Sequence, residues 1–203
     1  MPRYNKQRKA AVDAVVKKDI YQAVMRILAE KQPENLTMER VAEEAGMAKG
    51  TLYDYFKNKA ELILHVVQSI GRPYEERVKQ VFSSNLSIPK KLLKIAELNL
   101  LISSKHGEML DSIAKCASQS FAKSFTEEKT VEARRQGEKR LAMLIEEGVR
   151  SGIFRNMPTS DIIILYSALI DGFAKKLWAK KSDKTAAEEA KMLMKLFMNG
   201  VST

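Results

Sequence analysis

Apolar residues recur along most of this 203-residue chain at intervals of three and four, the spacing of one face of an α-helix. Residues 12–29 show the pattern clearly. Strict alternation of apolar and polar residues, which is typical of a strand, is scarce. The few breaks between periodic stretches carry Gly, Pro, Asn or Ser. The pattern therefore predicts an all-α fold of nine or ten helices.

Composition narrows the class of protein but does not locate a site. Hydrophobic residues make up 45% of the chain, enough for a packed core. The net charge of +10 fits a polyanionic partner such as nucleic acid or a membrane surface, and equally a solvated lysine-rich surface. The chain lacks an apolar run of about 20 residues, the length that crosses a bilayer, and its start lacks a signal-peptide pattern. We expect a soluble cytoplasmic protein with no membrane partner.

Residues 37–56 carry the most specific local pattern. With Met38 as the first position of a twenty-residue helix-turn-helix, small Ala42 falls where two helices cross closely. Gly46 falls in the turn, where it can adopt the left-handed conformation that ends a helix. Leu52 falls on the inner face of the second helix, one turn before Phe56. The spacing predicts two short helices joined by a tight turn, with Thr37 as the N-cap of the first.

The second of these helices has a polar outer surface. Hydroxyls and lysines bond phosphate oxygens, and a helix placed in the major groove reads base edges with its first residues. An ordinary helical hairpin with aromatic surface residues is the alternative. The residues left outside or beside the seam are Lys49, Gly50, Thr51, Tyr53, Asp54 and Tyr55.

The run LTMERVAEEAGMAKGTLYDYFKNKAEL, residues 36–62, resembles the DNA-binding domain of TetR-family regulators. The resemblance implies an N-terminal three-helix helix-turn-helix domain over residues 1–58. It also implies a C-terminal helical bundle over residues 59–203 that dimerises and binds a ligand. With the preceding helix, the resemblance covers about fifty residues.

The resemblance also implies roles for matching residues. A phosphate contact falls to Thr37, contacts in the major groove to Lys49, Gly50, Thr51 and Asp54, and further phosphate contacts to Tyr53, Tyr55 and Lys59. Two positions depart from the family pattern. Glu39 stands where a basic residue is common, so it could only accept hydrogen bonds, for instance from a cytosine amino group. Ala48 stands where Ser or Thr is common, so the second helix should lack a side-chain N-cap.

Two helices near the C-terminus, residues 160–181 and 185–199, are candidates for a homodimer interface. The first is apolar around much of its circumference, which indicates burial on most sides. Covering the monomer's own core is the alternative. Aromatic and sulfur side chains in the middle helices either line an effector pocket or form plain core. These residues are Met109, Cys116, Phe121, Phe125, Met143 and Phe173.

We therefore expect a sequence-specific transcriptional regulator whose dimer binds a palindromic double-stranded DNA operator. Repression, relieved by a small apolar effector, is the outcome that the resemblance implies. The chain shows no Gly-rich phosphate loop, paired-carboxylate signature or metal-ligand spacing, so we expect no enzyme, cofactor or metal site. A single cysteine, Cys116, leaves no intrachain disulfide. A nucleoid-associated protein using the same fold remains an alternative.

Three further expectations concern chain breaks and termini. The first eighteen residues contain six basic residues and one acidic residue, and form either a mobile DNA-contacting arm or a solvated terminus. A helix with Asn58 as its N-cap begins at Lys59, and ends near Gly71–Pro73 or resumes beyond it. A helix from Pro89 ends near Ser103, which leaves His106 in a surface loop.

Overall fold

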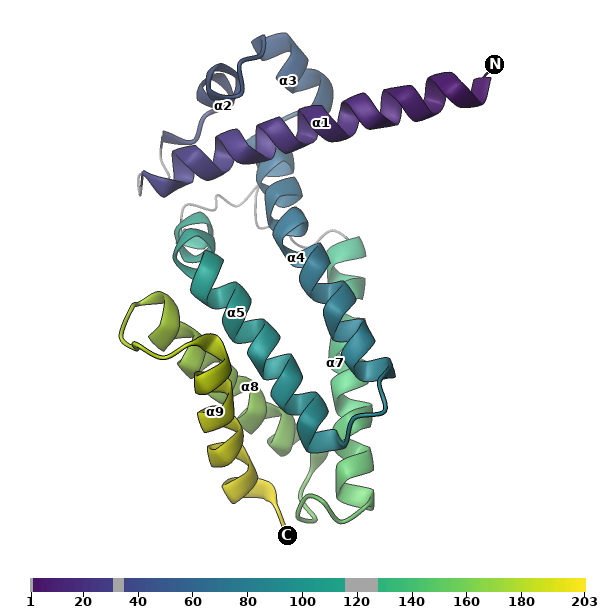
Figure 1. The fold of residues 1–203 in the computed structure, drawn as a ribbon, viewed down its shortest axis with the longest axis vertical. Coiled ribbons are helices and arrows are strands. Elements are labelled where there is room, and N and C mark those ends of the chain that lie inside the picture. The colour runs from purple at the N-terminus through teal and green to yellow at the C-terminus, as the bar shows by residue number, and fades with distance from the viewer. Residues whose placement is uncertain (1, 31–34, 116–127) are drawn as a thin grey trace. The chain divides into compact units, whose positions relative to one another are not determined.

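The computed structural model describes residues 2–30, 35–115 and 128–203 (Figure 1). Within these ranges the secondary structure is helical, apart from one isolated bridge between Phe154 and Ser202. The all-α prediction is confirmed. None of the helices in these ranges combines the length and the apolar character that crossing a membrane requires. The helices are α1 (Pro2–Ala29), α2 (Met38–Glu44), α3 (Lys49–Tyr55), α4 (Lys59–Ser83), α5 (Ile88–Lys115), α7 (Glu128–Arg150), α8 (Thr159–Trp178) and α9 (Ala186–Val201).

The described chain forms two compact units. The first contains residues up to Ser69 and residues 109–115, and the second contains Ile70–Glu108 and residues 128–203. The division falls inside α4, later than the predicted boundary after residue 58. Helix α4 therefore supplies residues to both units, because it runs unbroken from Lys59 to Ser83.

The first unit is organised around a small apolar core. Helix α1 contributes its C-terminal half and packs against α2, which in turn packs against α3. The start of α4 contributes further buried side chains. The apolar spacing that predicts these helices thus also identifies their inner faces. The buried side chains are Ile20, Ala23, Val24, Ile27, Leu28, Leu36, Met38, Val41, Ala42, Leu52, Phe56, Leu62, Ile63, Leu64 and Val66.

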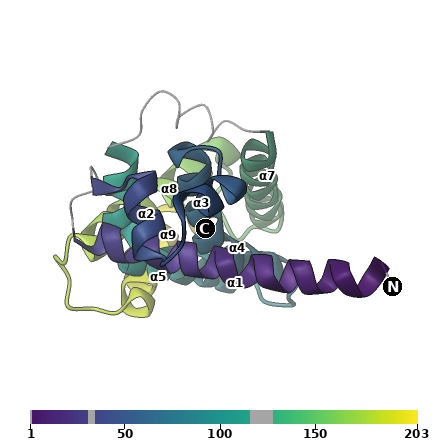
Figure 2. The same cartoon turned by 90° about the horizontal axis from the view of Figure 1, so that it is seen from above.

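The basic N-terminal segment belongs to α1 rather than to an irregular arm. Helix α1 begins at Pro2, and Figures 1 and 2 show it running well past α2 and α3. From Gln7 to Asp19 nearly every side chain is exposed. The helical conformation is explained by good helix formers, among them Ala10, Ala11 and Ala14. Neither sequence-based interpretation, a mobile DNA-contacting arm or a solvated terminus, included the helical structure of this segment.

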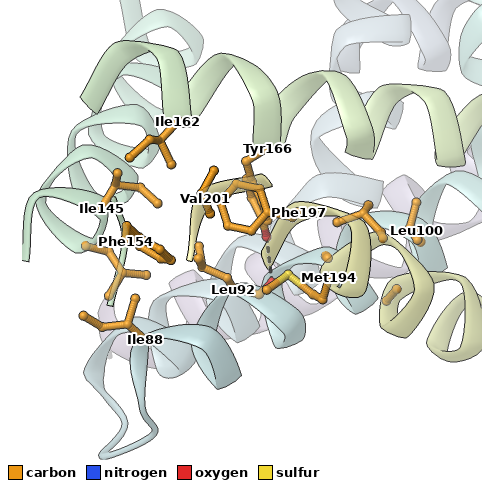
Figure 3. Packing of buried hydrophobic residues seen from close by; sticks show 14 of the residues in the cluster. Ile88, Leu92, Leu100, Ile145, Phe154, Ile162, Tyr166, Met194, Phe197 and Val201 are labelled. Atoms are coloured by element: carbon orange, nitrogen blue, oxygen red, sulfur yellow. Dashed lines mark hydrogen bonds between the residues drawn. The ribbon is translucent and has the colours of Figure 1, made fainter. Parts of the chain in front are cut away.

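The second unit has its own core, built from α5, α7, α8 and α9 (Figure 3). Tyr166 and Phe197 meet edge to face with ring centroids 5.3 Å apart, and Phe154 packs on Phe197 at 5.9 Å. The hydroxyl of fully buried Tyr166 donates a 2.6 Å hydrogen bond to the Leu92 carbonyl. Burial raises the pKa of Tyr166, so the hydroxyl remains a donor and its polar atom is satisfied.

Two predicted breaks are absent because tertiary packing stabilises the helix on both sides. Pro73 lies inside α4, and Ile70 before it and Val81 after it are both buried. Likewise α5 continues through the predicted end near Ser103. At Gly107 an added Cβ would lie 2.8 Å from Trp178 side-chain atoms, so this glycine permits a close approach instead of ending a helix.

His106 is consequently not a loop residue. It lies within α5 and is half-buried, and its Nδ1 atom has no hydrogen-bond partner among the described residues. Burial lowers the pKa of His106, with a smaller contribution from neighbouring Lys105. Its environment therefore favours the neutral ring.

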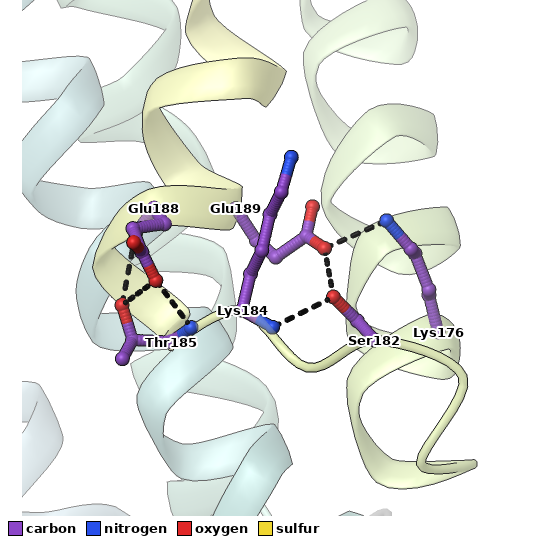
Figure 4. A network of polar contacts seen from close by, with 6 residues as sticks. All are labelled: Lys176, Ser182, Lys184, Thr185, Glu188 and Glu189. Carbon is purple, nitrogen blue, oxygen red and sulfur yellow. Dashed lines mark hydrogen bonds and ion pairs between the residues drawn. The ribbon is translucent and has the colours of Figure 1, made fainter.

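A buried carboxylate joins α8 to α9 (Figure 4). Glu189 has 0% exposure, and its Oε1 accepts a 2.6 Å bond from Lys176 Nζ and a second bond from the Ser182 hydroxyl. Thr185 and Glu188 complete a capping box at the start of α9. Burial alone would raise the pKa of Glu189, but the bonds from Lys176 and Ser182 hold it below its ordinary value. The carboxylate is therefore charged at neutral pH and fixes the turn between the helices.

Replacing Glu189 with Gln should alter the pH dependence of stability. A group whose pKa is lowered by folding stabilises the fold fully above its ordinary value of 4.5, and this contribution is lost as the pH falls through the lowered value. Urea unfolding from pH 7 to pH 3 should show a steeper loss of unfolding free energy below pH 4.5 in the wild type than in Glu189→Gln. At pH 7 the variant should be less stable by about 1–3 kcal/mol. Parallel profiles would contradict this assignment, and exposed Glu146→Gln is the control.

Candidate nucleic-acid interface

Helix α2 begins at a capped N-terminus. Thr37 is the N-cap residue, as predicted, and its hydroxyl accepts a 3.2 Å bond from the Arg40 backbone N–H. The Thr37 side chain is nevertheless exposed. A single residue thus starts the helix and remains accessible to a phosphate at the surface.

The turn between α2 and α3 has the predicted geometry. Gly46 adopts a φ of +66°, in the left-handed region that favours glycine. The Met47 N–H donates to the Ala42 carbonyl at 2.9 Å, which closes the end of α2. Ala42 and Leu52 are buried where the two helices pack together. This packing fixes which face of α3 points outward.

The outward face of α3 carries most of the predicted DNA-contacting side chains. Tyr53 is 41% exposed. Ala48 precedes the helix without a side-chain cap, which confirms the prediction for that residue. The other exposed residues of this face are Lys49, Gly50, Thr51 and Asp54.

Lys49 has partners on both sides. Its ammonium forms an ion pair with Glu39 of α2 and lies 5.8 Å from the centroid of the Tyr53 ring. The hydrogen bond from Lys49 lowers the pKa of Glu39, and the bond to Glu39 raises the pKa of Lys49. Both groups are therefore charged at neutral pH. Sequence reasoning found each residue separately but not their pairing, because the contact depends on the crossing of α2 and α3.

Tyr55 differs from the other predicted contacts. It is half-buried, and its hydroxyl donates a 2.9 Å bond to Asp13 Oδ1 of α1. This bond to Asp13 raises the pKa of Tyr55. In this structure Tyr55 braces α3 against α1, so a phosphate contact would require its hydroxyl to exchange or share that partner.

Lys59 is half-buried at the start of α4. Asn58 caps this helix, since its side-chain oxygen accepts a 2.9 Å bond from the Glu61 N–H. Glu61 in turn accepts a 2.8 Å bond from the Lys57 N–H. The predicted Asn58 cap is confirmed, and it places Lys59 in the first turn of α4.

Two arginines near α2 form ion pairs within the unit. Arg26 of α1 pairs with Glu44, and Arg40 of α2 pairs with Glu30 at 2.6 Å. Both pairs link α2 to the C-terminal end of α1. These two arginines therefore have partners within the protein, and their presence does not by itself indicate a nucleic-acid contact.

The described residues do not test the predicted effector pocket as a whole. Cys116, Phe121 and Phe125 lie outside them. Met109 belongs to the first unit, whereas Met143 and Phe173 belong to the second.

Within the second unit, Met143 and Phe173 have different surroundings. Met143 is 60% exposed, and Phe173 packs against the edge of the core with the Lys176 ammonium 5.7 Å from its ring centroid. Phe173 lines neither of two surface grooves of this unit.

The described residues of the second unit line at least two open surface grooves. One, of about 1020 Å³, runs along α7 and includes Met143 and Ile163 of α8. Its other lining residues are mainly charged, including Arg135, Lys139 and Arg140. The second, of about 530 Å³, lies between α4, α5 and α9, and its lining includes Val81, Leu86, Leu98 and Leu101.

Comparison with known sequences identifies the helix-turn-helix. Residues 20–66 match the family model for bacterial regulatory proteins of the tetR family. The helix-turn-helix of this chain is thus similar to the DNA-binding segment of that family. An HTH-type transcriptional regulator of Staphylococcus aureus is 36% identical over 56 residues, which are 28% of this chain and 30% of that protein. The chain thus aligns with about a third of the length of the curated relatives that it matches.

Solved structures extend the similarity to the whole fold. The regulator FadR from Bacillus subtilis, in complex with stearoyl-CoA, matches with a TM-score of 0.71 at 17% identity, over 90% of this chain and 98% of that one. A Saccharomonospora viridis protein in complex with choline matches with a TM-score of 0.74 at 17% identity, over 94% and 99%. The predicted architecture, a TetR-type helix-turn-helix followed by a helical domain, is confirmed.

Proposed function

We propose that this chain is a sequence-specific DNA-binding transcriptional regulator. The observation that carries the proposal is the TetR-type turn, whose buried Leu52 and Phe56 leave a polar face of α3 exposed. Lys49, Gly50, Thr51 and Asp54 then face the major groove, while Thr37, Tyr53, Tyr55 and Lys59 hold phosphates. A regulator of this kind acts in the cytoplasm, where bacterial DNA lies.

Selection of bound sequences from a random DNA pool tests this function. A dimeric regulator should select a palindrome whose half-sites lie about 34 Å apart, one helical turn of DNA. Tyr53→Ala and Lys59→Ala should both weaken binding to that operator. The lysine variant should also reduce the slope of log affinity against log salt by about 0.9, because one phosphate contact is lost. Gel-shift titrations at several salt concentrations measure both effects.

The control for these variants is Lys90→Ala, which removes an exposed lysine from α5 in the second unit. It should leave operator affinity unchanged. Unaltered binding in both Tyr53→Ala and Lys59→Ala would refute the placement of α3 on DNA. Broad binding without a selected sequence would instead favour a nucleoid-associated protein.

The second unit supports a homodimer through α8 and α9. These helices pack on each other, and Gly200 of α9 lies close to Leu165 of α8. Their outer faces still expose large apolar side chains, with Ile164 at 65% and Leu196 at 49% exposure. Leu165 and Met192 extend the same exposed set. Exposed apolar side chains on two packed helices can be buried in a symmetric dimer, in which each subunit offers the same surface.

Charge placed in this face should separate the subunits. Ile164→Glu or Leu196→Glu would bury a carboxylate at the proposed interface, so we expect the dimer dissociation constant to rise at least about tenfold. Sedimentation velocity over a concentration series measures the change. Leu86→Glu, at a comparably exposed leucine between α4 and α5, should leave the oligomeric state unaltered. A wild-type monomer, or a dimer insensitive to both substitutions, contradicts this interface.

We further infer that a small apolar effector releases the regulator from its operator, so that the protein acts as a repressor. Support comes from the fold's neighbours, one of which was solved with stearoyl-CoA and another with choline. In this chain α4 contributes to both units, which makes it the element through which an effector would alter DNA binding. Met109, Cys116, Phe121, Phe125, Met143 and Phe173 are the residues proposed for the pocket.

Trp178 provides a direct test because it is the chain's single tryptophan and packs against Gly107 in the second unit. Stearoyl-CoA, which carries an apolar acyl chain on a charged CoA group, should change Trp178 fluorescence through that chain and weaken operator binding by about 5- to 150-fold. The operator should weaken effector binding by the same factor. Choline serves as the cationic control and should do neither. Release by choline alone would contradict an apolar effector.

A further inference from the structure

The ion pair between Glu39 and Lys49 lies on the surface proposed to meet DNA. Glu39 stands in the first turn of α2, and Lys49 is the first residue of α3. Their side chains are 59% and 55% exposed. Lys49 is the cation among the residues proposed to enter the groove, so Glu39 holds the positive charge that this face of α3 offers to a phosphate.

The pair is not needed to hold α2 and α3 together. Val41, Ala42 and Leu52 are buried between the helices, and Gly46 sets the turn. Ion pairs between exposed groups add little to stability because water and salt screen them. The position of Glu39 is therefore better explained by what it does to a ligand than by folding.

Glu39 opposes binding to DNA of arbitrary sequence. General affinity for DNA comes from lysines and arginines that neutralise phosphates and release counterions. A lysine that is already neutralised by Glu39 releases no counterions when it meets DNA. The Glu39 carboxylate is itself repelled by neighbouring phosphates. Contact with any DNA thus requires Lys49 to leave its partner and Glu39 to be desolvated, which is costly unless something replaces the lost bond.

One group on a base edge can replace the bond that Glu39 loses when Lys49 leaves it. The exocyclic amino group of cytosine donates a hydrogen bond into the major groove, and carboxylates accept from it. Where a cytosine lies opposite Glu39, the carboxylate regains a partner and Lys49 becomes free to bind an adjacent phosphate. Where no cytosine lies opposite Glu39, the loss of the ion pair and the desolvation of the carboxylate both remain uncompensated.

We propose that Glu39 is a specificity-determining residue, which restrains Lys49 on non-operator DNA and makes tight binding depend on a cytosine amino group in each half-site. This inference rests on the proposed function, since it requires that the α2–α3 surface reads DNA. It assigns the acidic departure from the family pattern a role in excluding wrong sequences.

The test compares wild type with Glu39→Gln, which keeps the shape and removes the charge. Affinities are measured at several salt concentrations for the wild-type operator and for a random duplex of equal length. On the random duplex the slope of log affinity against log salt should be steeper by about 0.9 in the variant, because Lys49 gains one phosphate contact. Raising the salt from about 50 to about 200 mM should therefore weaken the variant's binding roughly threefold more than that of the wild type. The ratio of operator to random affinity should fall roughly tenfold.

Two further variants isolate the pair. Glu43→Gln removes the same charge about one turn along α2, from another exposed position, and should leave the ratio unchanged. In a Lys49→Met background, Glu39→Gln should no longer steepen the salt slope, because the lysine that it would release is absent. Selection from a random pool should show a cytosine preference in the wild type that Glu39→Gln loses.

The outcomes separate this inference from the proposed function. A wild type that selects no sequence contradicts the function itself. A wild type that selects an operator, with Glu39→Gln selecting the same bases at the same affinity ratio, overturns the role of Glu39. An equal effect from Glu43→Gln overturns it too, because that result would show a general charge effect. A marked fall in the melting temperature of Glu39→Gln would also overturn the role of Glu39, because it would show that the ion pair stabilises the fold.

Discussion

The packing of Leu52 against α2 is the contact on which the proposed interface depends. Leu52 is fully buried, and small Ala42 lets the two helices approach closely where they cross. With Leu52 and Phe56 directed inward, helical geometry leaves Lys49, Thr51 and Tyr53 outside. Gly46, at a φ of +66°, supplies the turn that this approach needs. The chemistry of the surface thus follows from a hydrophobic contact beneath it.

Polar interactions then adjust the orientation that packing establishes. Tyr55 bonds to Asp13 of α1, and Lys49 pairs with Glu39 of α2, so the side chains of α3 are held from two directions. In the second unit the buried carboxylate of Glu189 has the corresponding role at the turn between α8 and α9. In both places an ion pair or hydrogen bond orients side chains that lie above an apolar core.

Local sequence signals succeeded where one residue type is sufficient to cause a structure. Thr37 and Asn58 cap helices because their side-chain oxygens reach backbone N–H groups three residues ahead. The same reasoning failed at Pro73 and Gly107, which ordinarily end helices. Burial of Ile70 and Val81 sustains α4, and Gly107 gives Trp178 room against α5. Long-range packing overrode local preference there, and periodicity alone does not reveal it.

The sequence by itself determined the helical class, the position of the turn and the inner face of α3, because each follows from the spacing of a few residues along one chain segment. It also identified Glu39 and Ala48 as departures from the family pattern. Only the tertiary structure decided that Glu39 meets Lys49, that Tyr55 meets Asp13, and that Met143 and Phe173 have separate surroundings. These contacts join side chains from different helices, and their distances depend on how the helices cross, which the sequence pattern does not specify.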